Sequence, residues 1–105
     1  MGLHRDKQTD ELFKSILSLE SVEECYQYFE DLCTMKEIGD LTQRLEVARL
    51  LDEGSSYMQA GEATGASSAT IGRVKRCLNY GSGGYRLILD RMKKGGNTDA
   101  ESEGG

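Results

Sequence analysis

The chain has 105 residues, enough for one small domain, and carries 18 acidic against 13 basic side chains, a formal net charge of −5. It contains no proline, and Leu, Glu, Ala, Arg and Lys outnumber the β-branched residues, which predicts an all-α fold. No apolar run approaches the roughly 18 residues that span a bilayer, and the first residues lack the apolar core of a signal peptide. We therefore expect a cytoplasmic protein with no membrane partner.

The charges are unevenly distributed along the chain. Residues 8–40 hold nine acidic and two basic side chains, whereas residues 67–94 hold seven basic and one acidic side chain. Charges separated by more than about 10 Å are screened, so a binding surface responds to the local field rather than to the net charge. The second region is a candidate for nucleic-acid binding, although basic residues on a late helix are also typical of an ordinary solvated face.

The first predicted helix follows a start, residues 1–8, that we expect to be disordered. The helix begins at Thr9 or Asp10 and runs to about Leu19, because apolar side chains recur there at helical spacing. A second helix follows the capping-box sequence S-x-x-E at residues 21–24.

A second capping box, T-x-x-E at residues 34–37, opens a long third helix that ends near Asp52. Its apolar side chains cover more of the helix surface than one neighbouring helix would bury. They are Ile38, Leu41, Leu45, Val47, Ala48, Leu50 and Leu51. So wide an apolar stripe on so small a chain predicts burial against a second copy, and hence a homodimer.

Residues 56–79, SYMQAGEATGASSATIGRVKRCLN, are typical of a helix-turn-helix. A short helix at about 57–64 ends at Gly65, which tolerates the positive φ that the turn requires. Ser67 or Ser68 then caps the second helix of the motif. Small or apolar side chains occupy the positions where the two helices must pack, namely Ala60, Gly61, Thr64, Ala66, Ile71 and Val74. An ordinary αα-hairpin would also contain such a glycine, so the spacing alone leaves that alternative open.

The second helix of the motif carries the candidate DNA contacts. Its first turn has small side chains that can approach base edges, and its later turns have basic side chains that can reach phosphates. The candidate DNA-binding residues are Ser67, Ser68, Ala69, Thr70, Gly72, Arg73, Lys75 and Arg76. After the run GSGG at 81–84 a last helix is expected at about 85–94, and residues 95–105 are expected to form a disordered, acidic, Gly-rich tail.

These motifs resemble those of a known family. The run TGASSATIGRV resembles the DNA-reading element of the Trp repressor family, and TMKEIGDLTQRLEVARLLDEG resembles that family's long central helix. The stretch from DELFKSILSL to RVKRCLNYG, roughly residues 9–94, looks especially like the YerC/YecD group of this family. The resemblance implies an intertwined homodimer with about six helices per chain. It also implies a bacterial transcriptional regulator, by kinship a repressor, whose two helix-turn-helix units face successive major grooves of double-stranded DNA.

The resemblance also implies roles for single residues. The family's base-facing positions correspond here to Ser68, Ala69 and Gly72, and the last of these is a larger residue in the Trp repressor. The positions that surround tryptophan and its carboxylate in the Trp repressor correspond here to Thr34, Arg44 and Arg73. These three are therefore the candidate effector-binding residues.

A small-molecule effector is one alternative, and constitutive DNA binding without an effector is the other. Val74 and Cys77 stand where the Trp repressor has Gly and Ser, and overfilling a tight pocket typically costs about 1–3 kcal/mol. We therefore do not expect tryptophan to be the effector. Without an effector, Arg44 and Arg73 would contact phosphates or pair with surface carboxylates such as Glu46 or Glu62.

Catalytic and metal sites are not expected. The sequence shows no paired carboxylates on an apolar background, no Cys–His pair and no Gly-rich phosphate loop. Cys25, Cys33 and Cys77 are expected to be reduced thiols, and His4 is too isolated to complete a metal site with them. The sequence thus favours a DNA-binding regulator that is not an enzyme and has no cofactor. The alternative, which the acidic net charge favours, is a protein-interaction module that keeps the fold without binding DNA.

Overall fold

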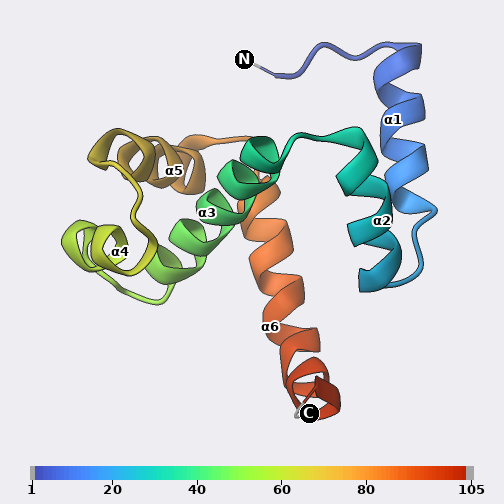
Figure 1. Cartoon of the computed structure of the whole chain (residues 1–105). Helices are drawn as coiled ribbons and strands as arrows, with labels where there is room; N and C mark the ends of the chain where they lie inside the picture. Colours follow the sequence, from blue (N-terminus) through green and yellow to red (C-terminus); the bar gives the residue numbers. More distant parts are fainter. Residues whose placement is uncertain (1, 104–105) are drawn as a thin grey trace. The chain divides into compact units, whose positions relative to one another are not determined.

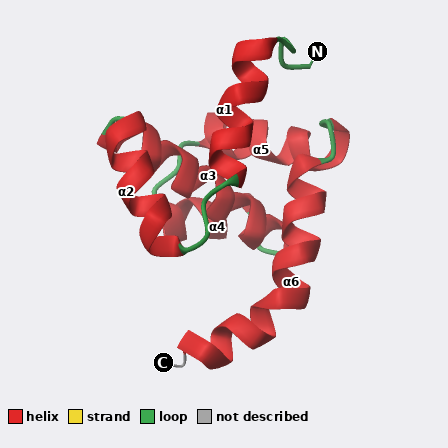
Figure 2. Cartoon of the chain, turned by 90° about the vertical axis from the view of Figure 1, so that its right-hand side faces the viewer, coloured by secondary structure: helices red, strands yellow, loops and turns green. Residues whose placement is uncertain are grey.

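The computed structural model describes residues 2–103 of the chain, with side chains up to Gly95. Every regular element in these residues is a helix, as Figure 2 shows, and this confirms the predicted fold class. The helices are α1 (Lys7–Leu17), α2 (Val22–Leu32), α3 (Met35–Asp52), α4 (Tyr57–Thr64), α5 (Ser68–Tyr80) and α6 (Gly84–Glu103). None of the described helices is both long enough and apolar enough to cross a membrane. The chain divides into two compact units, residues 1–39 and 40–105.

The start of α1 corrects the sequence prediction. The helix begins at Lys7, two residues before the expected start, because Asp6 is its N-cap and accepts a hydrogen bond from the Thr9 N–H at 2.7 Å. That bond lowers the pKa of the Asp6 carboxyl. Residues 7 and 8 are therefore helical rather than part of a disordered start. The helix also ends earlier than expected, at Leu17, with Ser18 as its C-cap.

Of the two predicted capping boxes, the one at residues 34–37 forms in full, whereas at residues 21–24 the Glu24 carboxylate accepts from the Glu20 N–H at 2.8 Å rather than from Ser21. The Ser21 hydroxyl accepts from the Glu24 N–H at 3.0 Å, and the helix that follows is α2. The Thr34 hydroxyl accepts from the Glu37 N–H at 3.0 Å, while the Glu37 carboxylate accepts from the Thr34 N–H at 2.9 Å. These reciprocal bonds satisfy N–H groups that a helix start leaves without intrahelical partners.

The second unit has a core to which α3, α4, α5 and α6 contribute (Figure 1). The buried side chains are Val47, Ala48, Leu51, Ala60, Ala66, Ile71, Val74 and Leu89. The predicted packing residues of the helix-turn-helix are thus in the core, except Thr64 and Gly61, which are half-buried. This core holds α4 and α5 against the end of the long helix α3.

Helix α6 is longer than the expected segment at 85–94. Its first half is tied to the end of α3, because the Asp52 carboxylate accepts two hydrogen bonds from Arg86, each 2.9 Å, and lies 3.0 Å from the Lys93 ammonium. With no proline to stop it, the helix continues to Glu103 through most of the segment predicted as a disordered tail, 95–105. The side chains of that segment, from residue 96 onward, lie outside the described part of the chain.

Candidate DNA-binding site

A tight turn joins α4 to α5. Gly65 has φ +75°, a left-handed conformation that a residue with a Cβ adopts only at a cost. The Thr64 hydroxyl supports the turn by accepting from the Ala66 N–H at 3.1 Å. A Cβ added at Gly61 would lie 3.3 Å from the Ile71 side chain, so the two helices approach closely at this glycine. This is the helix–turn–helix arrangement that the sequence predicts.

Ser67 fixes the start of α5, the second helix of the motif. Its hydroxyl accepts from the Thr70 N–H at 3.1 Å and lies 3.1 Å from the Thr70 hydroxyl. The Ser67 hydroxyl thus caps the helix and bonds the Thr70 hydroxyl, and neither residue lines the groove described next. Contact of Ser67 and Thr70 with DNA stays a prediction. The N-terminal end of α5 carries the positive end of the helix dipole, which favours an anion such as phosphate.

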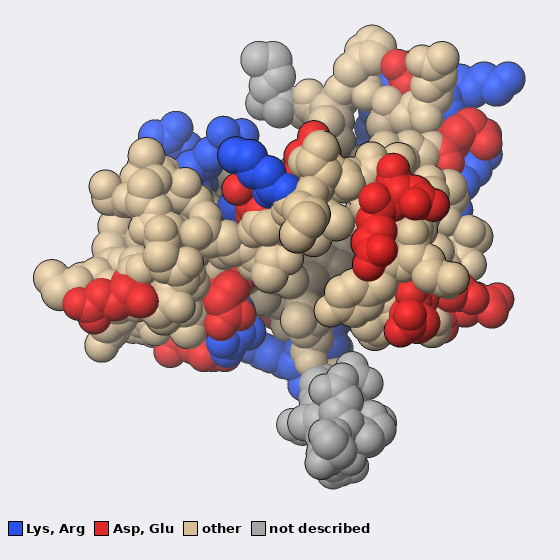
Figure 3. Space-filling model, viewed as in Figure 1, with Lys and Arg blue, Asp and Glu red and all other residues tan. Residues whose placement is uncertain are grey.

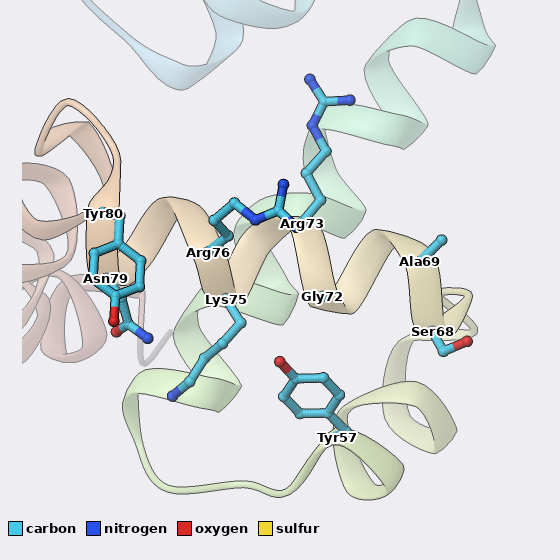
Figure 4. A pocket seen from close by; sticks show the side chains of 9 residues that line it. All are labelled: Tyr57, Ser68, Ala69, Gly72, Arg73, Lys75, Arg76, Asn79 and Tyr80. Carbon is cyan, nitrogen blue, oxygen red and sulfur yellow. The ribbon is translucent and has the colours of Figure 1, made fainter. Parts of the chain in front are cut away.

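An open groove of about 890 Å³ runs along α5 (Figure 4). It brings together six of the eight predicted DNA-binding residues, namely Ser68, Ala69, Gly72, Arg73, Lys75 and Arg76. Small side chains line it near the start of the helix, and basic side chains line it further along. This is the order that base reading and phosphate contact require.

The basic residues of the groove are free to bind an anion. Arg73 and Arg76 are exposed and Lys75 is half-buried, and the described residues provide none of the three with a carboxylate partner. Figure 4 shows Arg73 and Arg76 projecting from one side of α5 and Lys75 from the other. Basic side chains also gather over α5 on the surface drawn in Figure 3. The groove is therefore locally positive in an acidic protein.

Three groove residues were not predicted from the sequence: Tyr57, Asn79 and Tyr80. Asn79 and Tyr80 follow Arg76 by three and four residues. The helical period therefore places them on the same face of α5 as Arg76, and this signal could have predicted them as groove residues. Tyr57 comes from α4, the first helix of the motif, for which the sequence predicted no DNA contact. The signal in the sequence that could have indicated Tyr57 is its position as the first residue of α4, directly after the capping Ser56.

The two candidate effector-binding arginines lie near one phenol. Burial raises the pKa of Tyr85, and the positive charges of Arg44 and Arg73 act on the same hydroxyl in the opposite direction. The described residues provide neither arginine with a carboxylate partner. The alternative partner Glu46 is instead held by Arg49, whose hydrogen bond lowers the pKa of the Glu46 carboxyl.

The remaining residues of the effector prediction have other surroundings. Thr34 belongs to the first compact unit, where it caps α3. Val74 is 1% exposed and packs in the core of the second unit, so its side chain is already enclosed by protein. Cys77 is exposed on α5. The arrangement of Thr34 relative to the two arginines stays a prediction.

Together, the capped helix pair, its left-handed glycine turn and the basic groove define a helix-turn-helix protein. The family described as "Trp repressor protein" matches residues 7–93, and the chain belongs to this family. It is 58% identical over 98 residues to the uncharacterized protein YerC of Bacillus subtilis (strain 168), covering 93% of this chain and 91% of YerC.

Two solved structures share the fold. A candidate Trp repressor from Staphylococcus aureus has 53% sequence identity and a TM-score of 0.82, covering 85% of this chain and 89% of that one. A TrpR-like protein from Eubacterium eligens ATCC 27750 has 49% identity and a TM-score of 0.80, covering 83% of this chain and 91% of that one. These likenesses confirm the resemblance that the sequence motifs indicate.

Proposed function

We propose that the protein is a sequence-specific, DNA-binding transcriptional regulator that acts as a homodimer and represses its target genes. The observation that carries the proposal is the groove along α5, with small residues at its start and three basic residues that lack carboxylate partners among the described residues. Small residues let the helix approach base edges, and the free cations neutralise the phosphates on either side. Membership of a family described as repressors supports the same function.

The apolar surface of the first unit supports the homodimer. Neither α1 nor α2 has a buried residue. Leu17 is 82% exposed, Val22 71% and Met35 91%, although such side chains are normally covered in a stable domain. A second copy of the chain would cover this surface. Sedimentation equilibrium at micromolar concentration should therefore give twice the mass of the chain, and a stable folded monomer would contradict the proposal.

A two-fold dimer determines the shape of the DNA site. Two copies of α5 would enter successive major grooves, so the preferred site is a pseudo-palindrome with half-sites about 34–36 Å apart. The deciding experiment is selection of binding sites from random DNA with the purified protein at two salt concentrations. We expect a symmetric motif and an affinity that falls steeply as salt rises, because bound counterions are released from the DNA.

The second candidate function is a protein-interaction module that keeps the fold without binding DNA. The acidic first part of the chain favours it, since residues 8–40 carry nine acidic and two basic side chains. The same experiment separates the two functions. A selection that returns no motif, together with an affinity for DNA that barely responds to salt, would favour the interaction module.

We further propose that DNA binding is constitutive and needs no tryptophan. The supporting observation is Val74, whose side chain fills the core at a position where the Trp repressor has glycine. Arg44 and Arg73 could still bind a different small carboxylate, because a guanidinium donates two parallel hydrogen bonds to such a group. Titration of DNA binding with and without candidate carboxylates distinguishes the two cases.

A further inference from the structure

Tyr57 lines the groove from a capped helix start. It is the first residue of α4, and the capping box around it fixes the backbone. Ser56 accepts from the Gln59 N–H at 3.1 Å, and the Gln59 side chain accepts from the Ser56 N–H at 2.8 Å. Figure 4 shows the ring rising from α4 toward the middle of α5. The side chain is 48% exposed, so its removal should leave the core intact.

Gly72 leaves an empty space in the same groove. It lies in the middle of α5, where glycine is less stable than alanine. A Cβ added there would meet no atom within 4 Å, so neither packing nor backbone conformation in the free protein requires a glycine. A requirement for close approach by a bound molecule would explain it. Gly72 and Tyr57 both line this groove.

We propose that Tyr57 is a specificity-determining residue that contacts the 5-methyl group of a thymine, and that Gly72 provides the space which this methyl group enters. The inference rests on the proposed DNA binding. Gly72 is one helical turn beyond Ser68, on the side of α5 that lines the groove, so the base pair opposite it adjoins the one that Ser68 faces. An aromatic ring beside an open space is an apolar surface, and the thymine methyl is the apolar group that the major groove offers.

The test replaces thymine by uracil, which removes only the methyl group. Each thymine of the selected site is changed in turn, in both half-sites, and the affinity of the wild type is compared with that of Tyr57→Ala. At one symmetric pair of positions, uracil should weaken the wild type by about fourfold per half-site, the effect of one buried methyl group. For Tyr57→Ala this penalty should vanish, and the salt dependence should stay unchanged.

Two further variants serve as controls. Tyr57→Phe retains the ring and should keep the uracil penalty. Met58→Ala removes the neighbouring side chain, which is 73% exposed and does not line the groove, and it should behave like the wild type. A uracil penalty that persists in Tyr57→Ala overturns the inference. So does a uniform loss of affinity with a weaker salt dependence, since that pattern would make Tyr57 a phosphate contact.

Gly72→Ala tests the space itself. Because the added methyl group meets nothing in the free protein, the variant should unfold at a temperature a few degrees higher than the wild type. Its affinity for the selected site should nevertheless fall by about fivefold or more, the usual effect of one disrupted base-pair contact. Unchanged or tighter binding would overturn the inference. If the wild type selects no motif, the proposed function itself fails, whereas a motif that both variants leave unchanged rejects only the role of Tyr57 and Gly72.

Discussion

Removal of the Asp52 carboxylate should destabilise the second unit. Asp52 is the last residue of α3, and its side chain is 13% exposed. Both of its oxygens accept from Arg86 at 2.9 Å, and the Lys93 ammonium lies 3.0 Å away. The variant Asp52→Asn keeps the shape of the side chain but removes the charge that holds Arg86 and Lys93 of α6.

The pKa of Asp52 sets the magnitude of this effect. The hydrogen bonds from Arg86, with those from Lys93, lower it from 3.8 to about 2. A difference of that size corresponds to about 2.4 kcal/mol of favourable interaction with the charged form. Arg86 and Lys93 are 47% and 61% exposed, so solvent screens much of the interaction. We expect Asp52→Asn to lower the free energy of unfolding by about 1 kcal/mol at pH 7.

The sign of the pH dependence follows from the difference between the pKa of Asp52 in the folded protein and its ordinary value. The folded protein holds this carboxyl deprotonated to a lower pH than the unfolded chain does, so its contribution is complete above about pH 4. The contribution is lost as the pH falls from about 4 toward 2, where the folded carboxyl also takes up a proton. The wild type and Asp52→Asn should therefore converge in stability only below about pH 2, where the carboxyl is protonated in both the folded and the unfolded chain.

Urea unfolding followed by circular dichroism measures both quantities. The protein concentration must be held constant, because the stability of a dimer depends on it. Asp90→Asn is the matched control, since Asp90 accepts from the same Arg86 at 3.2 Å but is 55% exposed, and its removal should cost less than about 0.5 kcal/mol. Equal effects of the two variants at pH 7, or a loss in Asp52→Asn that persists unchanged at pH 3, would refute the reasoning.

Three further predictions concern the helix-turn-helix. Changing Lys75 and Arg76 together to Ala should weaken binding on all sequences and reduce the slope of log affinity against log salt by roughly 3 to 4, for four lost phosphate contacts per dimer; an unchanged slope in a filter-binding or anisotropy titration would argue against these contacts. Gly65→Ala should cost about 1–2 kcal/mol in urea unfolding, because the residue has φ +75°, and no loss of stability would contradict that conformation. Calorimetry should detect no binding of millimolar tryptophan to the wild type, and Val74→Gly should destabilise the buried core by about 2 kcal/mol or more rather than create a tryptophan site. Micromolar binding of tryptophan that also tightens DNA binding would show that Val74 is no obstacle.

The sequence by itself determined the helical class, the position of the turn and most of the helix starts. Signals of this kind act between near neighbours along the chain. The Thr34–Glu37 and Ser56–Gln59 capping boxes close hydrogen bonds over three residues, and Gly65 satisfies its turn through its own φ. The pair Asp6 and Thr9 is of the same kind, so the sequence also contains the local signal for the start of α1 at Lys7.

Only the tertiary structure decided which residues share the groove and what holds α6. Asp52 and Arg86 are 34 residues apart, and no local pattern pairs one surface carboxylate with one arginine among many. The burial of Val74 likewise depends on a core to which helices far apart in the sequence contribute side chains. Tyr57 faces α5 because the turn at Gly65 packs α4 against α5. A helical period in the sequence predicts which residues share a face of one helix, but the packing between helices decides which other helix that face meets.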